Sequence, residues 1–200
     1  MWMQIFFVAI IFWFGMGKNT EGMEIEAAVK MGSVGFSENG IQEGNKAIIA
    51  GEINVGHRFG FGNMEMSMEA WSSWEPLDED KEIPEKVLRI GAKFSYEVGK
   101  VIPALGVDFY RLEREKPIKY ADAWSDSHFF VLTPEVEFRY KFFYGKAGLA
   151  FPLIGGYGYR AEAGLRWKAL RFGPFFDYMK VDEDRDFEIQ RRGVLLGVRF

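Results

Sequence analysis

Residues 86–98 read KVLRIGAKFSYEV, and polar and apolar residues alternate from Leu88 to Val98. One set consists of Leu88, Ile90, Ala92, Phe94, Tyr96 and Val98, and the other of Arg89, Gly91, Lys93, Ser95 and Glu97. Successive side chains of a β-strand point to opposite faces of the sheet. The stretch therefore predicts a strand that has one apolar face without charge and one polar face.

The same alternation recurs over the rest of the chain after residue 22 and predicts ten strands. They cover residues 23–36, 46–59, 63–74, 86–98, 102–112, 129–140, 143–153, 157–168, 170–180 and 190–200. A length of about eleven residues suits a strand that crosses a membrane at a tilt. We expect an all-β, closed antiparallel transmembrane barrel of ten strands. Pro152 and Pro174 weaken the seventh and ninth strands, which leaves eight as the alternative number.

The predicted connections differ in length. Those after the second, fourth, sixth and eighth strands are tight turns, whereas those after the first, third, fifth and ninth are longer and polar. Residues 154–156, after the seventh strand, are a short exception. This alternation predicts short periplasmic turns at one end of the barrel and longer external loops at the other.

Alternation alone does not decide which face points outward. In a soluble, lipocalin-like ligand binder the apolar face would line the interior. Two features favour lipid contact instead. Glycine is frequent on the polar face, where a narrow lumen needs small residues. Aromatic residues such as Phe59, Tyr140 and Trp167 end the apolar face, as at a membrane interface.

The N-terminus differs from the barrel segment. Residues 1–17 contain no charged side chain, and the apolar run at residues 5–14 is too short for a spanning helix. This pattern predicts an export signal over residues 1–22, cleaved near residue 17 or 22, with the barrel over residues 23–200.

Composition excludes several kinds of site. The net charge of -4 argues against a nucleic-acid partner, because phosphate binding needs a basic face. The chain has no cysteine, which excludes disulfides and thiolate metal sites. We find no phosphate-binding loop, dinucleotide fingerprint, zinc pattern or calcium loop. The sequence therefore predicts neither a cofactor nor a metal.

The candidate functional residues lie on the polar face. We expect a network of paired charges in the lumen, because buried charges need partners. Its predicted members are Arg89, Lys93, Glu135, Glu137, Arg139, Arg160, Glu162 and Arg166. Such pairing would fill the lumen of a barrel this narrow, so any pore would be small.

One alternative is an enzyme. His128 follows Trp124, Ser125, Asp126 and Ser127, and these residue types together invite a hydrolase site at the external rim. However, adjacent residues on an extended strand point to opposite faces, so Ser127 and His128 are poorly placed to bond each other. We therefore predict no catalytic residue and expect a solvated loop histidine.

The final strand, together with the export signal and the alternating connections, resembles bacterial outer-membrane β-barrels. Val194, Leu196, Val198 and the terminal Phe200 match the alternating apolar pattern that ends in an aromatic residue in that class. The resemblance implies recognition of this strand by the barrel-assembly machinery. It also implies contact with outer-membrane lipid and lipopolysaccharide, location in the bacterial outer membrane, and a structural, adhesive or narrow-pore role.

Overall fold

The fold is a closed antiparallel β-barrel of ten strands. The computed structural model describes residues 22–38, 41–59, 62–73, 84–114, 127–182 and 186–200. The strands are β1 (Met23–Glu38), β2 (Ile41–Phe59), β3 (Gly62–Ser73), β4 (Pro84–Ser95), β5 (Val101–Arg114), β6 (Ser127–Tyr140), β7 (Phe143–Pro152), β8 (Gly156–Trp167), β9 (Leu170–Val181) and β10 (Phe187–Arg199). The ten-strand prediction is confirmed, and the alternative of eight is wrong.

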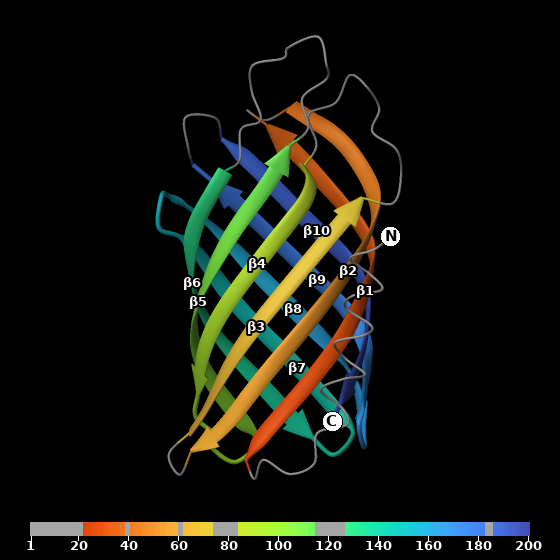
Figure 1. Ribbon diagram of the computed structural model, residues 1–200, viewed down its shortest axis with the longest axis vertical. Coiled ribbons are helices and arrows are strands. Elements are labelled where there is room, and N and C mark those ends of the chain that lie inside the picture. The colour runs from red at the N-terminus through yellow and green to blue at the C-terminus, as the bar shows by residue number, and fades with distance from the viewer. Residues whose placement is uncertain (1–21, 39–40, 60–61, 74–83, 115–126, 183–185) are drawn as a thin grey trace.

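Each strand pairs with its neighbours in the chain, and β10 closes the barrel on β1 (Figure 1). The closing ladder runs from Glu26 opposite Arg199 to Glu38 opposite Phe187. None of the ten described strands is left with a free edge, which satisfies the main requirement of a sheet in lipid. Among the described residues, no helix is long and apolar enough to cross a membrane. The predicted export signal lies almost entirely outside the described residues.

We define two ends of the barrel. The turn end carries the connections β2–β3, β4–β5, β6–β7 and β8–β9 together with Met23 and Phe200, and the loop end carries the other five connections (Figure 1). The turn predicted at Lys141–Phe142 is present, and the turn predicted at Ala169 also includes Lys168, because β8 ends at Trp167. At the β4–β5 turn, β4 ends earlier than predicted, but backbone bonds between Val98 and Val101 continue the pairing.

The prediction of a long connection after the first strand is wrong. The β1–β2 ladder continues to Glu38 opposite Ile41, beyond an irregularity between Phe36 and Ser37. The polar and glycine-rich residues of this segment pair through their backbone, which does not require an apolar face. Polarity alone was therefore a poor guide to where these two strands end.

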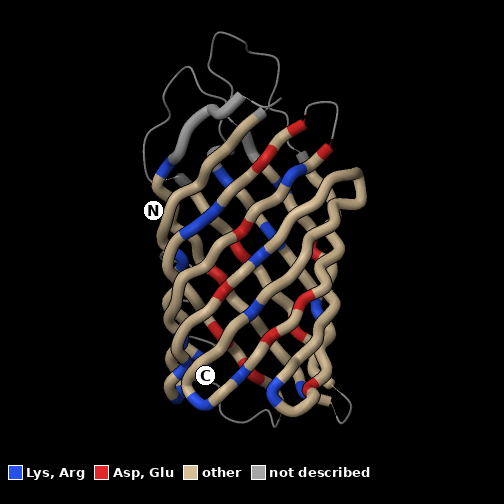
Figure 2. Tube along the Cα trace, turned by 180° about the vertical axis from the view of Figure 1, so that it is seen from behind, with Lys and Arg blue, Asp and Glu red and all other residues tan. Residues whose placement is uncertain are grey.

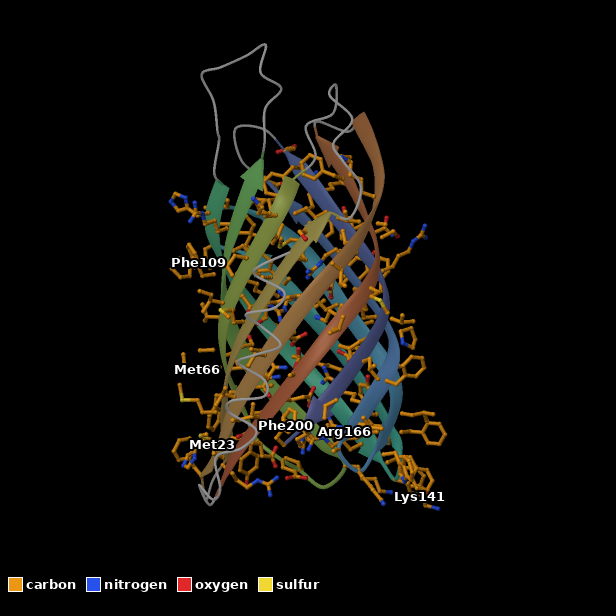
Figure 3. The ribbon with its side chains drawn as sticks, turned by 45° about the vertical axis from the view of Figure 1, so that its right-hand side comes forward. Met23, Met66, Phe109, Lys141, Arg166 and Phe200 are labelled. Atoms are coloured by element: carbon orange, nitrogen blue, oxygen red, sulfur yellow. The ribbon has the colours of Figure 1, made fainter. Side chains whose placement is uncertain are left out.

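The two faces of the barrel have opposite character. The outward side chains include Met66, Leu105 and Phe172, each more than half exposed, while the inward side chains include the charged Glu52, Glu69 and Arg89, all of them buried. In Figure 3, Met66 and Phe109 extend away from the ribbon, whereas Arg166 lies within the outline of the barrel. This distribution is the reverse of that in a soluble ligand-binding barrel.

Two pairs of facing glycines bring neighbouring strands together. A Cβ on Gly173 of β9 would lie 1.9 Å from the Ala163 carbonyl oxygen and 2.7 Å from Cα of Gly164 in β8. Gly32 and Gly193, opposite each other in β1 and β10, approach in the same way. Only glycine permits this backbone contact. The glycines of the inward face thus allow neighbouring strands to approach closely, in addition to leaving space in the lumen.

Candidate functional site: the barrel interior

The centre of the lumen is built around Glu69 of β3, whose side chain is fully buried. Its carboxylate contacts three cations: Arg191 Nη1 at 3.0 Å, Lys30 Nζ at 3.1 Å and Arg89 Nε at 3.2 Å. These come from β10, β1 and β4, so one carboxylate connects strands that lie up to three positions from β3 around the barrel. Burying an ionised group without a partner costs free energy. Here the carboxylate and the three cations lie close together, and their mutual attraction offsets that cost.

Further carboxylates extend this central cluster. Glu52 receives Lys30 Nζ at 2.7 Å and lies 3.6 Å from Arg89 Nη2. Asp177 accepts from Arg191 Nη2 at 2.7 Å. The cations are therefore shared among several acceptors rather than paired one to one, which ties the positions of β1, β2, β3, β4, β9 and β10 to one another.

Arg160 forms a second contact across the lumen. Its Nη1 lies 2.8 Å from Asp108 Oδ2, and its Nη2 donates to the hydroxyl of Tyr110. Asp108 and Tyr110 are on β5, whereas Arg160 is on β8. This side chain therefore bridges strands that are three positions apart around the barrel and occupies the space between them.

A second cluster lies closer to the turn end. Glu135 of β6 contacts Lys93 Nζ at 3.2 Å and Lys146 Nζ at 3.3 Å. Lys93 also reaches Glu65 at 2.9 Å. Arg171 is placed between Glu26 at 3.0 Å and Glu162 at 3.4 Å.

Glu137 and its cations lie nearest the turn end. The carboxylate accepts from Arg139 Nε at 2.5 Å and lies 3.6 Å from Arg166 Nη1. Glu135 and Glu137 share the inward face of β6, as the alternation indicates. Each carboxylate has its own cations, so they do not form the free carboxylate pair that acid–base catalysis would use.

All eight residues predicted for the charge network have an ion-pair partner. Sequence reasoning did not assign the acceptor at its centre or several partners: Lys30, Glu52, Glu69, Asp108, Lys146, Arg171, Asp177 and Arg191. Each falls on the inward parity of its strand, so the alternation contained a signal for them. The alternation did not indicate which of these residues contact one another across the lumen.

The loop half of the interior has an unpredicted apolar cluster. Its members are Val34, Phe36, Ile48, Ala50, Trp71, Val87, Tyr110, Leu112, Phe129, Val131, Ala150, Met179, Val181, Phe187 and Ile189. Phe129 stacks on Tyr110 at 5.5 Å between ring centroids and packs against Phe187 at 6.0 Å. We refer to this group as the apolar plug. It adjoins the central charges, because the Arg191 guanidinium lies 5.7 Å from the Trp71 ring.

The spaces that remain inside the barrel are small at the level of the charges. One cavity of about 20 Å³ lies between the plug and Arg160, and another of about 30 Å³ is bounded by Glu52, Glu135 and Lys146. Cavities of this size hold only one or two water molecules. At the turn end, a wider basin of about 250 Å³ is lined by Arg58, Asn63, Ser95 and Arg139, among others. Of these three spaces, bounded by described residues, the one at the turn end is the widest.

The candidate catalytic histidine lies outside the lumen. His128 is exposed on β6, with its ring 6.5 Å from Phe109, which points outward (Figure 3). Trp124, Ser125 and Asp126 lie outside the described residues. His57 is exposed near the turn end and contacts Phe59 at 4.8 Å. Within the described residues, no group of three histidine, aspartate or glutamate side chains is arranged to hold a metal ion.

The residues predicted as an assembly signal lie on the outward face of the last strand. Val194, Leu196 and Phe200 are about half exposed, and Val198 is less so. Phe200 donates its backbone N–H to the carbonyl of Ile25 at 2.8 Å, so the pairing with β1 extends to Phe200.

No protein-family model matches the sequence, and no curated protein sequence matches it significantly. Among solved structures, Neisserial surface protein A aligns over 92% of this chain and 100% of its own length, at 14% identity and a TM-score of 0.44. The translocator domain of the autotransporter NalP from Neisseria meningitidis is 13% identical over 94% of this chain and 92% of its own, with a TM-score of 0.44.

A deltaS2 mutant of TodX, a monoaromatic hydrocarbon channel, is 7% identical over 88% of this chain and 68% of its own, again with a TM-score of 0.44.

Proposed function

We propose that this chain is an integral protein of the bacterial outer membrane whose barrel acts as a closed structural or adhesive scaffold. The observation that carries the proposal is the reversed distribution of side chains, with ion pairs buried inside and large apolar residues exposed outside. A folded chain that exposes so many apolar side chains over its whole circumference needs an apolar surrounding.

The height of the outward apolar surface also supports a lipid surrounding. On β5 the outward face is apolar from Val101 at the turn end to Phe109, and the charged Arg111, ten residues beyond Val101, bounds it at the loop end. At a rise of about 3.4 Å per residue and a tilt near 45°, this distance spans about 24 Å along the barrel axis. Transmembrane barrels present an outward apolar band of about 25 Å. The outward surface therefore fits a bilayer.

The contents of the lumen favour a scaffold over a pore. The apolar plug fills the loop half, and shared ion pairs occupy the centre around Glu69 and Arg160. A hydrated ion or small solute would have to separate these side chains, leaving buried charges without partners. The lumen therefore supports a scaffold better than the narrow pore that the sequence also suggested.

Conductance through a planar bilayer tests the scaffold role. We expect the refolded barrel to insert and to conduct little. Arg160→Ala combined with Arg166→Ala removes two side chains that cross the lumen, and adding Phe129→Ala shortens the plug, so conductance should increase in that order. A large, steady conductance of the unmodified barrel, comparable to that of a sixteen-stranded porin, would contradict the proposal.

A further inference from the structure

Three lysines stand at the tips of the turns: Lys100 between β4 and β5, Lys141 between β6 and β7, and Lys168 between β8 and β9. All three are exposed, and Figure 2 shows basic residues at the tips of the turn end. Among the residues that the structure describes, no carboxylate lies within ion-pair distance of any of them. The lumen cations named above are ion-paired with carboxylates, whereas the described residues provide these three lysines with no such partner.

Each ammonium group lies over an exposed aromatic ring of the outward face. Lys100 Nζ is 4.3 Å from the centre of the Tyr140 ring, and Lys141 Nζ is 5.6 Å from the same ring. Lys168 Nζ is 5.3 Å from the Trp167 ring. Exposed tyrosine and tryptophan rings of a membrane protein lie at the level of the lipid headgroups. The cation–π contacts therefore hold the lysines at that level.

The turns themselves are fixed in place. The carbonyl oxygens of Lys100, Phe142 and Ala169 accept backbone hydrogen bonds from Arg139, Arg166 and Arg199 at 2.9, 2.6 and 2.7 Å. Each turn is thereby fastened to a further strand of the barrel. The lysines consequently project from a rigid rim rather than from free loops.

Backbone conformation gives an independent reason to look for a role of the charge. Lys141 and Lys168 have φ angles of 53° and 52°, in the left-handed region that favours glycine or asparagine. The β4–β5 turn has glycine in this conformation, at Gly99 with φ of 64°. The geometry of the turn therefore does not explain lysine at positions 141 and 168.

We propose that Lys100, Lys141 and Lys168 bind headgroup phosphates of anionic phospholipids in the leaflet at the turn end. Phosphate oxygens are acceptors for ammonium groups, and a basic residue near an anionic bilayer surface changes lipid affinity by roughly five-fold. The inference rests on the proposed function, because the rim reaches a leaflet only when the barrel spans the bilayer.

Substitution to glycine separates the role of the charge from the role of the turn. Lys141→Gly with Lys168→Gly removes two charges and relieves two left-handed lysines, so the barrel should be as stable to urea as the unmodified protein, or more so. The matched control, Lys141→Arg with Lys168→Arg, retains the charges. The full barrel and both variants would be inserted into phosphatidylcholine vesicles that contain spin-labelled phosphatidylglycerol or spin-labelled phosphatidylcholine.

Electron paramagnetic resonance then gives the association of each labelled lipid with the barrel. We expect the preference for phosphatidylglycerol to fall by roughly twenty-five-fold in the glycine variant, at five-fold per lysine, and to persist in the arginine variant. An inserted glycine variant with unchanged preference would overturn this inference alone. Release of the unmodified barrel from vesicles by alkaline carbonate would overturn the proposed function, and with it this inference.

Discussion

Glu69 is central to the contacts in the lumen, since one carboxylate with no exposed surface serves cations from three strands. Such a residue is not recognisable from its own neighbourhood in the sequence, Met66–Ser67–Met68–Glu69, which identifies only the face on which it lies. Its importance arises from the closure of the barrel, which brings β10 and β1 close to β3.

Replacing Glu69 with Gln should therefore be strongly destabilising. The amide keeps the shape of the side chain but leaves Arg191, Lys30 and Arg89 with one acceptor charge fewer, and breaking a buried ion pair in this way costs about 3–5 kcal/mol. Urea unfolding of the barrel in lipid vesicles measures the change. Glu97→Gln at the exposed Arg58–Glu97 pair is the control and should change little. Equal effects at both sites would mean that the lumen charges are well solvated.

A single residue also tests the lipid face. Ile90 is 42% exposed on the outward side of β4, near the middle of the apolar band. Ile90→Arg should cost roughly 2–4 kcal/mol of barrel stability in lipid, because a charge at mid-bilayer loses its hydration. Tyr96→Arg, at the turn end of the same outward face, should cost only about 0–1 kcal/mol. The ratio of the two effects, measured by unfolding from vesicles, reports depth. The reverse order would contradict the placement of the bilayer.

At the scale of the strands, the facing glycines set how closely neighbours approach. Gly173→Ala would place a Cβ 1.9 Å from a backbone oxygen that has no freedom to retreat, and we expect a loss of about 1–3 kcal/mol from overpacking. Gly145→Ala is the matched control, because no atom lies within 4 Å of the added Cβ. It should be neutral or slightly stabilising, since glycine weakens a strand. Similar stability of the two variants would show that β8 and β9 can separate without cost.

The last strand allows assembly to be separated from stability. Removal of Phe200 deletes one outward ring and one backbone bond to Ile25, so the refolded barrel should unfold at nearly the same urea concentration as the full chain. If the strand is the signal that the assembly machinery reads, the yield of membrane-inserted protein in cells should nevertheless fall severalfold. Quantitative blotting of outer-membrane fractions measures this yield. Unchanged yield would contradict the assignment of Val194, Leu196, Val198 and Phe200.

The alternation predicted all ten strands and which side chains of each strand share a face, because a two-residue period is local and needs no knowledge of the partner strand. The ends of β1 and β2 were missed for the opposite reason. Ser37 to Asn45 contains polar and glycine residues that look like a loop, yet part of it continues a hairpin through backbone bonds. Side-chain polarity does not report backbone pairing, so strand ends in polar hairpins are beyond this kind of inference.

At the scale of the whole molecule, the interior has two parts that the sequence did not distinguish. Alternation is clear near the turn end and fails near the loop end, where consecutive apolar residues such as Phe129–Phe130–Val131–Leu132 supply both faces. Phe129 and Val131 face inward and are buried in the plug, while Phe130 and Leu132 face outward. Such apolar runs were the available sequence signal for the plug. They were ambiguous because a run of apolar residues does not indicate how much of the lumen its side chains fill.

Placing charges inside and apolar residues outside is the central claim for the molecule, and the absence of cysteine allows a clean test. Single cysteines would be introduced at Ile90 and Ala92, on the outward face, and at Glu97, which is exposed beyond β4 at the turn end. The barrel in lipid vesicles would be treated with a water-soluble maleimide. We predict rapid labelling at position 97 and little at 90 and 92, which should instead be quenched by brominated lipid when they carry a fluorophore. Labelling of positions 90 and 92 as fast as position 97, without quenching, would mean that water covers the outward face and would contradict the account.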